Sequence, residues 1–220
     1  MKVMLVGSSS KLSLSIADVV KKHGHSVVMA GRNGPDIIFD PFKSPIEDIS
    51  TLVDDSIDAF IINQGLLYPK RITDQSISEI EKSFYVNLIS IVRLCEVVLT
   101  KLDNVKIFII GSESGKKGSF DTSYFLCKSG LRSYVRERKI RVPGQQIILF
   151  SPSTIHDSNM TSNRQDIDRL NANLEAHPKK RFVGNIEVAE IINDFLSCHF
   201  DYISNSEIEI NGGKFARLDY

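Results

Sequence analysis

Short runs of β-branched and aliphatic residues alternate along this chain with longer segments of helical period, and no repeat or low-complexity stretch interrupts them. This alternation favours a parallel sheet with helices on both faces. A length of 220 residues is within the range over which α/β proteins form a single domain. We therefore expect one doubly wound α/β domain spanning residues 1–220.

Seven segments have the composition of strands: Lys2–Val6, His25–Ala30, Asp36–Phe39, Ile57–Ile62, Val105–Ile110, Gln146–Phe150 and Glu207–Ile210. Five segments have helical period: Leu12–His23, Ile46–Val53, Ser76–Lys101, Thr122–Arg138 and Ile186–Leu196. Only five residues, from Gly31 to Pro35, separate the second strand from the third. A parallel crossover normally needs a dozen or more residues, so this link is a loop or the third strand is displaced.

Composition excludes several classes of function. The 27 basic and 27 acidic residues leave no net charge to attract nucleic acid or an anionic membrane. The apolar runs have strand length, and no secretory signal precedes the first strand, so we expect a cytoplasmic protein without a membrane span. Cys95, Cys127 and Cys198 lack the close pairing of a metal or redox site and are interpreted as reduced, buried thiols.

The first strand is followed by a serine-rich turn and then by an amphipathic helix. Free backbone N–H groups and the helix dipole make such a turn an anion site. The usual dinucleotide fingerprint has further glycines where Ser9 and Leu12 stand, so only Gly7 fits and an ordinary strand-to-helix turn stays an alternative. Serine hydroxyls and the charge of Lys11 would still favour a pyrophosphate. The expected contacts are Gly7, Ser9, Lys11, Leu12 and Ser13.

Arg32 ends the second strand, where dinucleotide sites discriminate between cofactors. An acidic residue there accepts from the ribose of NAD, whereas an arginine can form a forked pair with the 2′-phosphate of NADP. We therefore expect NADP(H) to be preferred, with NAD(H) possible. The alternative is a solvated loop arginine.

Tyr124 and Lys128 lie four residues apart in a helical segment, so both project from one helix face. A nearby ammonium favours the phenolate and tunes a tyrosine for proton transfer. Ser112 follows the strand Val105–Ile110, which places its hydroxyl at the carboxyl edge of the sheet, where α/β ligand sites lie. Taken alone, the Tyr and Lys pair is more typical of an exposed helix face than of a catalytic site.

These residues belong to an ordered set of motifs that resembles the short-chain dehydrogenase/reductase family over nearly the whole chain. The segments that carry the resemblance are Ile62-Asn63-Gln64-Gly65, Val86-Asn87, Ile110-Gly111-Ser112, Tyr124-Phe125-Leu126-Cys127-Lys128, Ser151-Pro152-Ser153-Thr154, the region from Arg181 to Ala189, and Ile210-Asn211-Gly212-Gly213. The family has further glycines in the turn, where this chain has Lys11 and Ser13. The run Ser-Lys-Leu-Ser is similar to the turn of bacterial enoyl-acyl-carrier-protein reductases, which still bind a dinucleotide.

The resemblance implies a Rossmann-type fold and a role for each matched residue. Tyr124 would be the general acid in reduction, Lys128 would lower the pKa of Tyr124 and bind the nicotinamide ribose, and Ser112 would orient the substrate oxygen. Asn87 would hold a water that links Lys128 to solvent. The further cofactor contacts implied are Asp40 near the adenine, Asn63 and Gly65 after the fourth strand, and Pro152, Thr154 and Ile155 near the nicotinamide.

The expected activity is reversible reduction of a ketone or aldehyde by hydride transfer, without a metal. The polar stretch His156–Lys180 resembles a lid and favours a small polar substrate. The alternatives are a sugar-nucleotide-modifying enzyme with the same residues and a non-catalytic NADP-binding regulatory protein. The resemblance also suggests a homodimer or homotetramer packed through the helices Ser76–Lys101 and Thr122–Arg138.

Overall fold

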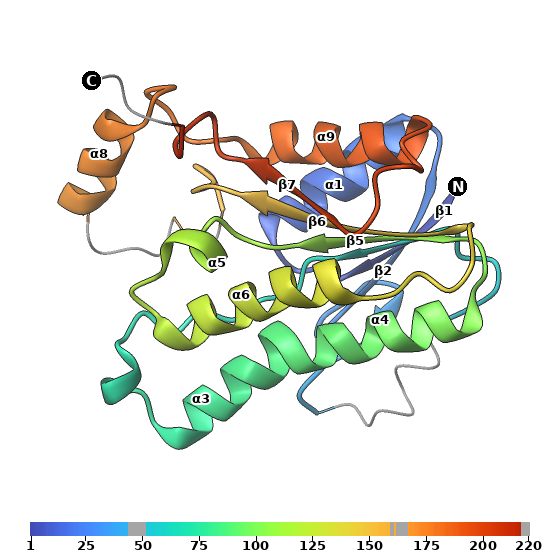
Figure 1. Ribbon diagram of the computed structural model, residues 1–220, viewed down its shortest axis with the longest axis horizontal. Helices are drawn as coiled ribbons and strands as arrows, with labels where there is room; N and C mark the ends of the chain where they lie inside the picture. Colours follow the sequence, from blue (N-terminus) through green and yellow to red (C-terminus); the bar gives the residue numbers. More distant parts are fainter. Residues whose placement is uncertain (44–51, 159–160, 162–166, 217–220) are drawn as a thin grey trace.

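The computed structural model describes residues 1–43, 52–158, 161 and 167–216, and a seven-stranded, all-parallel sheet forms its centre (Figure 1). The strand order is β3-β2-β1-β4-β5-β6-β7. The strands are β1 Lys2–Val6, β2 Ser26–Gly31, β3 Ile37–Ile38, β4 Ala59–Ile62, β5 Val105–Ile110, β6 Gln145–Pro152 and β7 Ser206–Ile210. The predicted doubly wound α/β class is confirmed.

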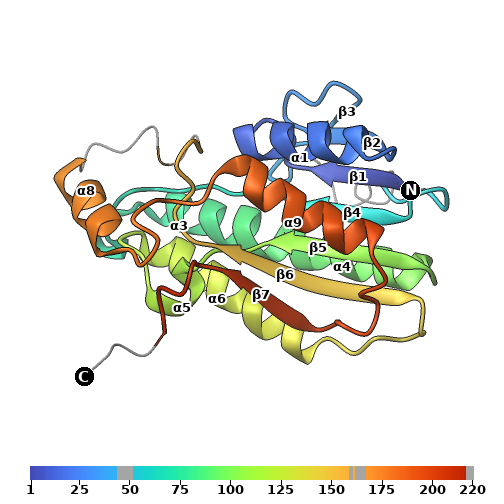
Figure 2. The same ribbon diagram turned by 90° about the horizontal axis from the view of Figure 1, so that it is seen from above.

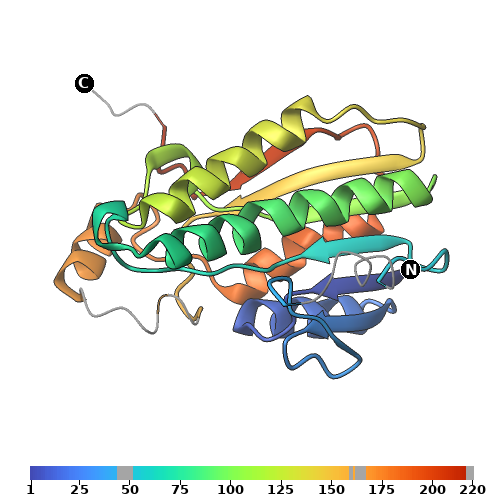
Figure 3. The ribbon, with the colours of Figure 1, turned by 90° about the horizontal axis from the view of Figure 1, so that it is seen from below.

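Helices cover both faces of the sheet. They are α1 Lys11–Lys22, α3 Ile77–Phe84, α4 Ser90–Lys101, α5 Ser114–Lys117, α6 Thr122–Glu137, α8 Ile167–Ala176 and α9 Asn185–Ser197, with a 3₁₀ turn at Ile72–Asp74 and a π-helical turn at Tyr85–Ile89. α1 and α9 lie side by side on one face, and α3, α4 and α6 lie on the other (Figures 2 and 3).

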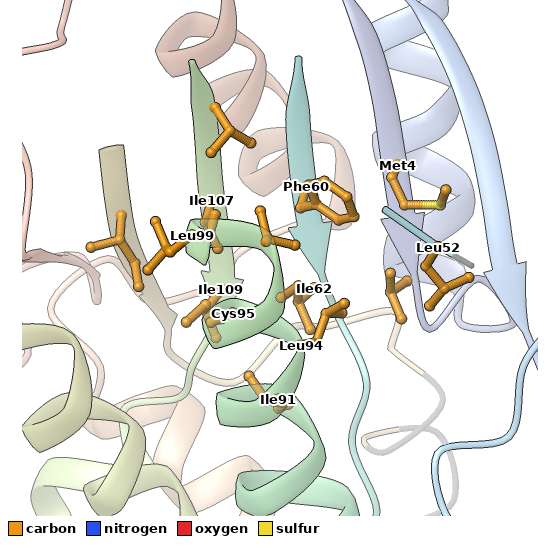
Figure 4. Close-up of a cluster of buried hydrophobic side chains, with 14 of the residues drawn as sticks. Met4, Leu52, Phe60, Ile62, Ile91, Leu94, Cys95, Leu99, Ile107 and Ile109 are labelled. Carbon is orange, nitrogen blue, oxygen red and sulfur yellow. The ribbon is translucent and has the colours of Figure 1, made fainter. Parts of the chain in front are cut away.

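Two apolar cores lie between these helices and the sheet. One joins α4 and α6 to the sheet, and Figure 4 shows Ile91, Leu94, Cys95 and Leu99 of α4 against side chains such as Ile107. The other joins α1 and α9 to the opposite face. Every residue of β4 is buried, as expected for a parallel strand that is covered on both sides.

The strand order reverses at β1, which pairs with β2 on one side and with β4 on the other. In doubly wound sheets the loops diverge at such a point and leave a crevice beyond the carboxyl ends of the strands. The segments that follow β1, β2 and β4 therefore line the same crevice, which is where the sequence predicts the dinucleotide.

The weakest part of the topology prediction was the link between β2 and β3, and the structure has a loop there. The backbone of Gly31 accepts hydrogen bonds from the N–H groups of Gly34 and Phe39, at 2.9 Å each, and these bonds fold the chain back alongside β2. The Asp36 carboxylate accepts a third bond from the Met29 N–H. β3 is shortened to two residues as a result.

The predicted helix Ser76–Lys101 is interrupted by the π-helical turn, and the predicted helix Ile46–Val53 lies mostly outside the described residues. α5 and α8 were not predicted. α8 lies in the stretch interpreted as a polar lid. The prediction of a buried Cys198 was wrong: α9 ends at Ser197, and Cys198 is exposed beyond the apolar stripe, whereas Cys95 and Cys127 are buried.

Within the described part of the chain, one helical segment, Ile77–Lys101, is long and apolar enough by composition to cross a membrane. Half of its most apolar stretch is buried inside the protein, where α4 packs on the sheet. Its apolar character is therefore that of a core helix.

Candidate active site

A cavity of about 140 Å³ opens at the reversal of the strand order. Its lining includes six of the predicted cofactor residues, namely Gly7, Ser9, Arg32, Asp40, Asn63 and Gly65. Eight further lining residues were not predicted, and among them Ser10, Gln64 and Lys82 bring polar side chains. The turn after β1, the end of β2 and the loop after β4 therefore meet as predicted.

Gly7 lets the first turn approach β4 closely. Its φ is +91°, in the left-handed region, and a Cβ there would lie 2.6 Å from the carbonyl carbon and oxygen of Asn63. No other residue type fits without displacing this backbone. The one glycine that the turn retains is the one that the packing requires.

Side-chain hydrogen bonds hold the rest of the turn. Ser10 caps α1 by accepting from the Ser13 N–H at 3.0 Å, and the Ser13 hydroxyl donates to the Gly7 carbonyl at 2.7 Å. The Asn63 amide donates to both hydroxyls, at 2.9 and 2.8 Å. Ser13 is fully buried in this network, and Leu12 packs into the core, so these two residues support the turn from behind while Ser9 and Lys11 are exposed.

At the other side of the cavity Arg32 is exposed and Asp40 is partly buried. Lys82 of α3 also lines the cavity, with its ammonium 5.3 Å from the ring centroid of Phe42. Two cations and one carboxylate therefore line this part of the cavity, and the net positive charge suits an anionic group.

Tyr124 and Lys128 occupy the buried face of α6. Their exposed fractions are 8% and 3%, so the alternative of a surface pair is excluded. The Lys128 ammonium donates to the Ile110 carbonyl at 2.9 Å, at the end of β5, and lies 5.5 Å from the ring centroid of Tyr124. Ser112, two residues beyond β5, hydrogen-bonds the Tyr124 hydroxyl. The predicted Ser, Tyr and Lys set is brought together.

Burial dominates the electrostatics of this set. It raises the pKa of Tyr124 to about 12, against a smaller lowering by the Ser112 hydrogen bond, and it lowers the pKa of Lys128 to about 8. The expected lowering of the Tyr124 pKa by Lys128 is not seen, because the ammonium is directed to the Ile110 carbonyl. Tyr124 is therefore protonated at neutral pH, the state that a proton donor needs.

Asn87 lies within the π-helical turn and is fully buried. Its amide oxygen accepts from the Leu66 N–H and its amide nitrogen donates to the Leu66 carbonyl, both at 2.8 Å, with a further bond to Ser83. Asn87 thus fixes the loop after β4 in the manner of a neighbouring strand. The π-helical turn, a feature frequent at functional sites, directs its side chain to that loop. Its role in a water relay stays a prediction.

Asp121 is the most informative residue that the sequence prediction missed. It is 1% exposed and caps α6 by accepting from the Tyr124 N–H at 2.9 Å. The same carboxylate accepts from the Tyr68 N–H and the Gln75 amide, at 2.7 and 2.9 Å. Its position directly before a predicted helix is a typical N-cap signal that could have identified it. Asp121 sets where α6 starts and so where Tyr124 lies.

The predicted nicotinamide contacts follow β6. Pro152 ends this strand, and its carbonyl accepts from the Glu113 N–H, next to Ser112, at 2.9 Å. Ile155 is buried and forms an isolated parallel bridge with Val183. Thr154, the residue before Ile155, is partly buried. These residues flank the Ser112 loop but do not line the cavity beside Gly7 and Arg32.

The strand order, the glycine turn after β1 and the buried Ser, Tyr and Lys set together define a dinucleotide-type α/β fold, that of the short-chain dehydrogenases/reductases. Solved structures agree over almost the full chain. A short-chain dehydrogenase/reductase of glucose/ribitol dehydrogenase type from Brucella melitensis superposes with a TM-score of 0.86 at 20% identity, over 98% of this chain and 97% of its own. The aldohexose dehydrogenase of Thermoplasma acidophilum gives 0.84 at 18% identity, over 100% and 95%.

A short-chain dehydrogenase family protein from Francisella tularensis gives a TM-score of 0.83 at 18% identity, over 98% of this chain and 99% of its own. No family model matches the sequence, and no curated protein sequence matches it either. At these identities the likeness establishes the fold, and the activity has to be argued from the site.

Proposed function

We propose that this protein is an NADP(H)-dependent oxidoreductase of the short-chain dehydrogenase/reductase type, which reversibly reduces a ketone or aldehyde of a small polar substrate. The observation that carries the proposal is the burial of Tyr124 and Lys128 beside Ser112 at the carboxyl edge of the sheet. A lysine is almost never buried unless it is paired or functional. Here it has one carbonyl partner, and no carboxylate that the structure describes pairs with it.

The residues around the cavity fit a dinucleotide. Gly7 allows the backbone approach that a pyrophosphate needs, and the capped amino end of α1 offers a positive dipole. Gln64 lines the cavity with a buried amide oxygen that has no hydrogen-bond partner among the described residues. An unmet acceptor there suits a ligand that carries hydroxyl or amino donors. Arg32 and Lys82 supply charge for a 2′-phosphate.

The bound cofactor would supply the hydride. Ser112 would hold the carbonyl oxygen of the substrate, and Tyr124 would donate its phenolic proton to the alkoxide as that oxygen becomes negative. A pKa of about 12 keeps this proton on Tyr124 until the oxygen becomes the stronger base. The Lys128 ammonium, which is directed to the Ile110 carbonyl and not to the phenol, would hold the nicotinamide ribose, and Asp121 keeps Tyr124 in place by capping α6.

The cofactor assignment is tested by titrating the protein with NADPH and NADH. We expect tighter binding of NADPH, and we expect Arg32→Glu to reverse or abolish the preference because the forked pair becomes a repulsion. Lys116→Glu, which places the same charge change on α5 outside the cavity, is the control. Equal affinities in the unmodified protein would contradict the role of Arg32.

The chemical assignment is tested with a panel of small polar aldehydes and ketones. Tyr124→Phe should keep NADPH affinity and remove most turnover, since only the transferable proton is lost. Tyr134→Phe is the matched control, because this tyrosine lies on the same helix and donates to Glu96 away from the site. A protein that bound NADPH, reduced nothing in the panel and was indifferent to Tyr124→Phe would instead be a regulatory NADP-binding protein.

We also propose a cytoplasmic location and assembly as a homodimer or homotetramer through the helical segment from α3 to α4 and through α6. Ile77, Ile89 and Leu126 expose 76%, 42% and 40% of their surfaces on the helical layer to which these helices belong. Apolar side chains exposed in this way favour contact with another copy of the chain. Sedimentation of the purified protein, with Leu126→Glu as the test variant, would show whether α6 forms that contact.

A further inference from the structure

A second cavity, of about 130 Å³, lies between the turn after α8, the ends of β6 and β7, and the start of α9. The carboxyl ends of β6 and β7 point toward α8 in Figure 1. This cavity shares no lining residue with the cavity beside Gly7 and Arg32. None of the matched catalytic residues lines it, and its volume is many times the roughly 15 Å³ that one water molecule needs.

His177 gives this cavity a buried hydrogen-bond donor. The side chain is 3% exposed, and its Nδ1 accepts from the Lys179 N–H at 3.1 Å. A ring nitrogen that accepts carries no proton, so the proton of the neutral imidazole is on Nε2. That Nε2 is buried and has no partner among the described residues. Because buried donors are almost always paired, the arrangement calls for an acceptor.

Gly212 packs closely against the imidazole. Its φ is +61°, and a Cβ there would lie 2.8 Å from His177 Cε1 and 3.6 Å from Nε2. Gly212 and His177 both line the cavity, so this packing fixes the imidazole in the cavity wall. A side chain at this position would displace His177 and Lys179, both of which line the cavity.

The charge of the lining favours an anion. Lys179, Arg181 and Glu187 all contribute to the cavity. Arg181 and Glu187 form a bidentate pair at 2.6 and 2.8 Å, which neutralises both and holds the pKa of Glu187 near 2. Lys179 has no carboxylate partner in the part of the chain that is described, so the cavity keeps one uncompensated positive charge. Ser153 adds a buried hydroxyl group.

We propose that this cavity binds a small oxyanion, a phosphate or carboxylate group, with the His177 Nε2–H as its buried donor and Lys179 as its counter-charge. The site is separate from the dinucleotide cavity. It does not depend on the proposed activity, since none of its lining residues has a role in the proposed hydride transfer.

The test is a titration of the full chain with inorganic phosphate and, separately, with acetate, at constant ionic strength made up with sodium chloride. The imidazole ¹⁵N and ¹H resonances of His177 are the readout, and they are assigned by their loss in His177→Gln. Only the resonances of His177, one of five histidines, are followed, so an anion that binds beside Arg32 does not affect this readout. We expect the Nε2 resonances to shift with saturation by at least one anion, and to shift equally in Arg32→Gln.

A pair of neighbouring lysines provides the matched comparison. Lys179→Gln should lower the affinity for the anion at least about fivefold, roughly the loss of one charged contact. Lys180→Gln makes the same charge change one residue away, at a side chain that donates to the Glu175 carbonyl and does not line the cavity, and should leave the affinity unchanged. Both lysines are exposed, so neither variant should disturb folding. Unmoved His177 resonances, or equal losses in the two variants, would overturn the proposal.

Discussion

Replacement of Lys128 by methionine should change the pH dependence of stability more than any other single substitution in the site. Burial lowers the pKa of Lys128 from its ordinary value of 10.5 to about 8. At about 1.36 kcal/mol per unit, the folded protein holds the charged lysine at a cost of about 3 kcal/mol. Lys128→Met keeps the length of the side chain and removes the charge.

The direction of this pH dependence follows from the number of protons that the folded and unfolded states bind. Below pH 8 the lysine is charged in both states, so the full cost is present. Between pH 8 and 10.5 the unfolded chain binds more protons than the folded one, so the stability of the unmodified protein rises with pH in this window. Lys128→Met lacks this rise, although it also loses the hydrogen bond to Ile110 at every pH.

Urea unfolding of both proteins at intervals from pH 7 to pH 10.5 measures the effect. The free energy of unfolding of Lys128→Met minus that of the unmodified protein should fall by about 3 kcal/mol across the window, with other titrating groups cancelling in the difference. Lys139→Met, at an exposed lysine just beyond α6, is the control and should give a level difference. A level difference for Lys128→Met as well would refute the buried charge.

Three further substitutions test the positioning of the site. Asp121→Ala should lower the free energy of unfolding by about 2 to 4 kcal/mol in urea, because a helix cap and two further hydrogen bonds, from the Tyr68 N–H and the Gln75 amide, are lost, and a loss below about 1 kcal/mol would contradict this. Gly7→Ala should lower the affinity for NADPH at least about tenfold in a fluorescence titration, since a Cβ would clash with the Asn63 backbone. Gly24→Ala, with φ +85° and no atom within 4 Å, carries the backbone strain without the clash and should leave NADPH affinity unchanged. Ser112→Ala should lower turnover with little effect on NADPH affinity, and an equal loss in both would assign Ser112 to the cofactor instead.

The sequence predicted the centre of the sheet well because the central strands are buried on both faces. Such strands appear as short continuous apolar runs, and β1 and β5 begin and end where the pattern indicates. β3 is shorter than predicted because its length is set by the hydrogen bonds to Gly31, and no composition rule reports those bonds. α8 was missed because a helix with a polar surface resembles a loop in composition.

The candidate site was predicted unevenly for a similar reason. Tyr124, Lys128 and Ser112 were found because their spacing and order are visible in the chain, whereas Gln75 and Asp121 are joined only by the fold, 46 residues apart. The pKa of Tyr124 was expected to fall and instead rises to about 12, since proximity of Lys128 in sequence says nothing of where its ammonium is directed. Contacts over long sequence separation and the direction of side chains have to be read from the structure.

The hydrogen-bonded turn after β1 bears on the thermodynamics of ligand association. A glycine-rich loop retains conformational freedom that a ligand must remove, and that ordering subtracts from affinity. Here Ser10, Ser13 and Asn63 lock the turn before any ligand arrives, so the ordering is completed during folding. The loss of glycines from the fingerprint thus yields a rigid, preorganised receptor, whose association with a dinucleotide should carry a smaller entropic penalty than a flexible loop would impose.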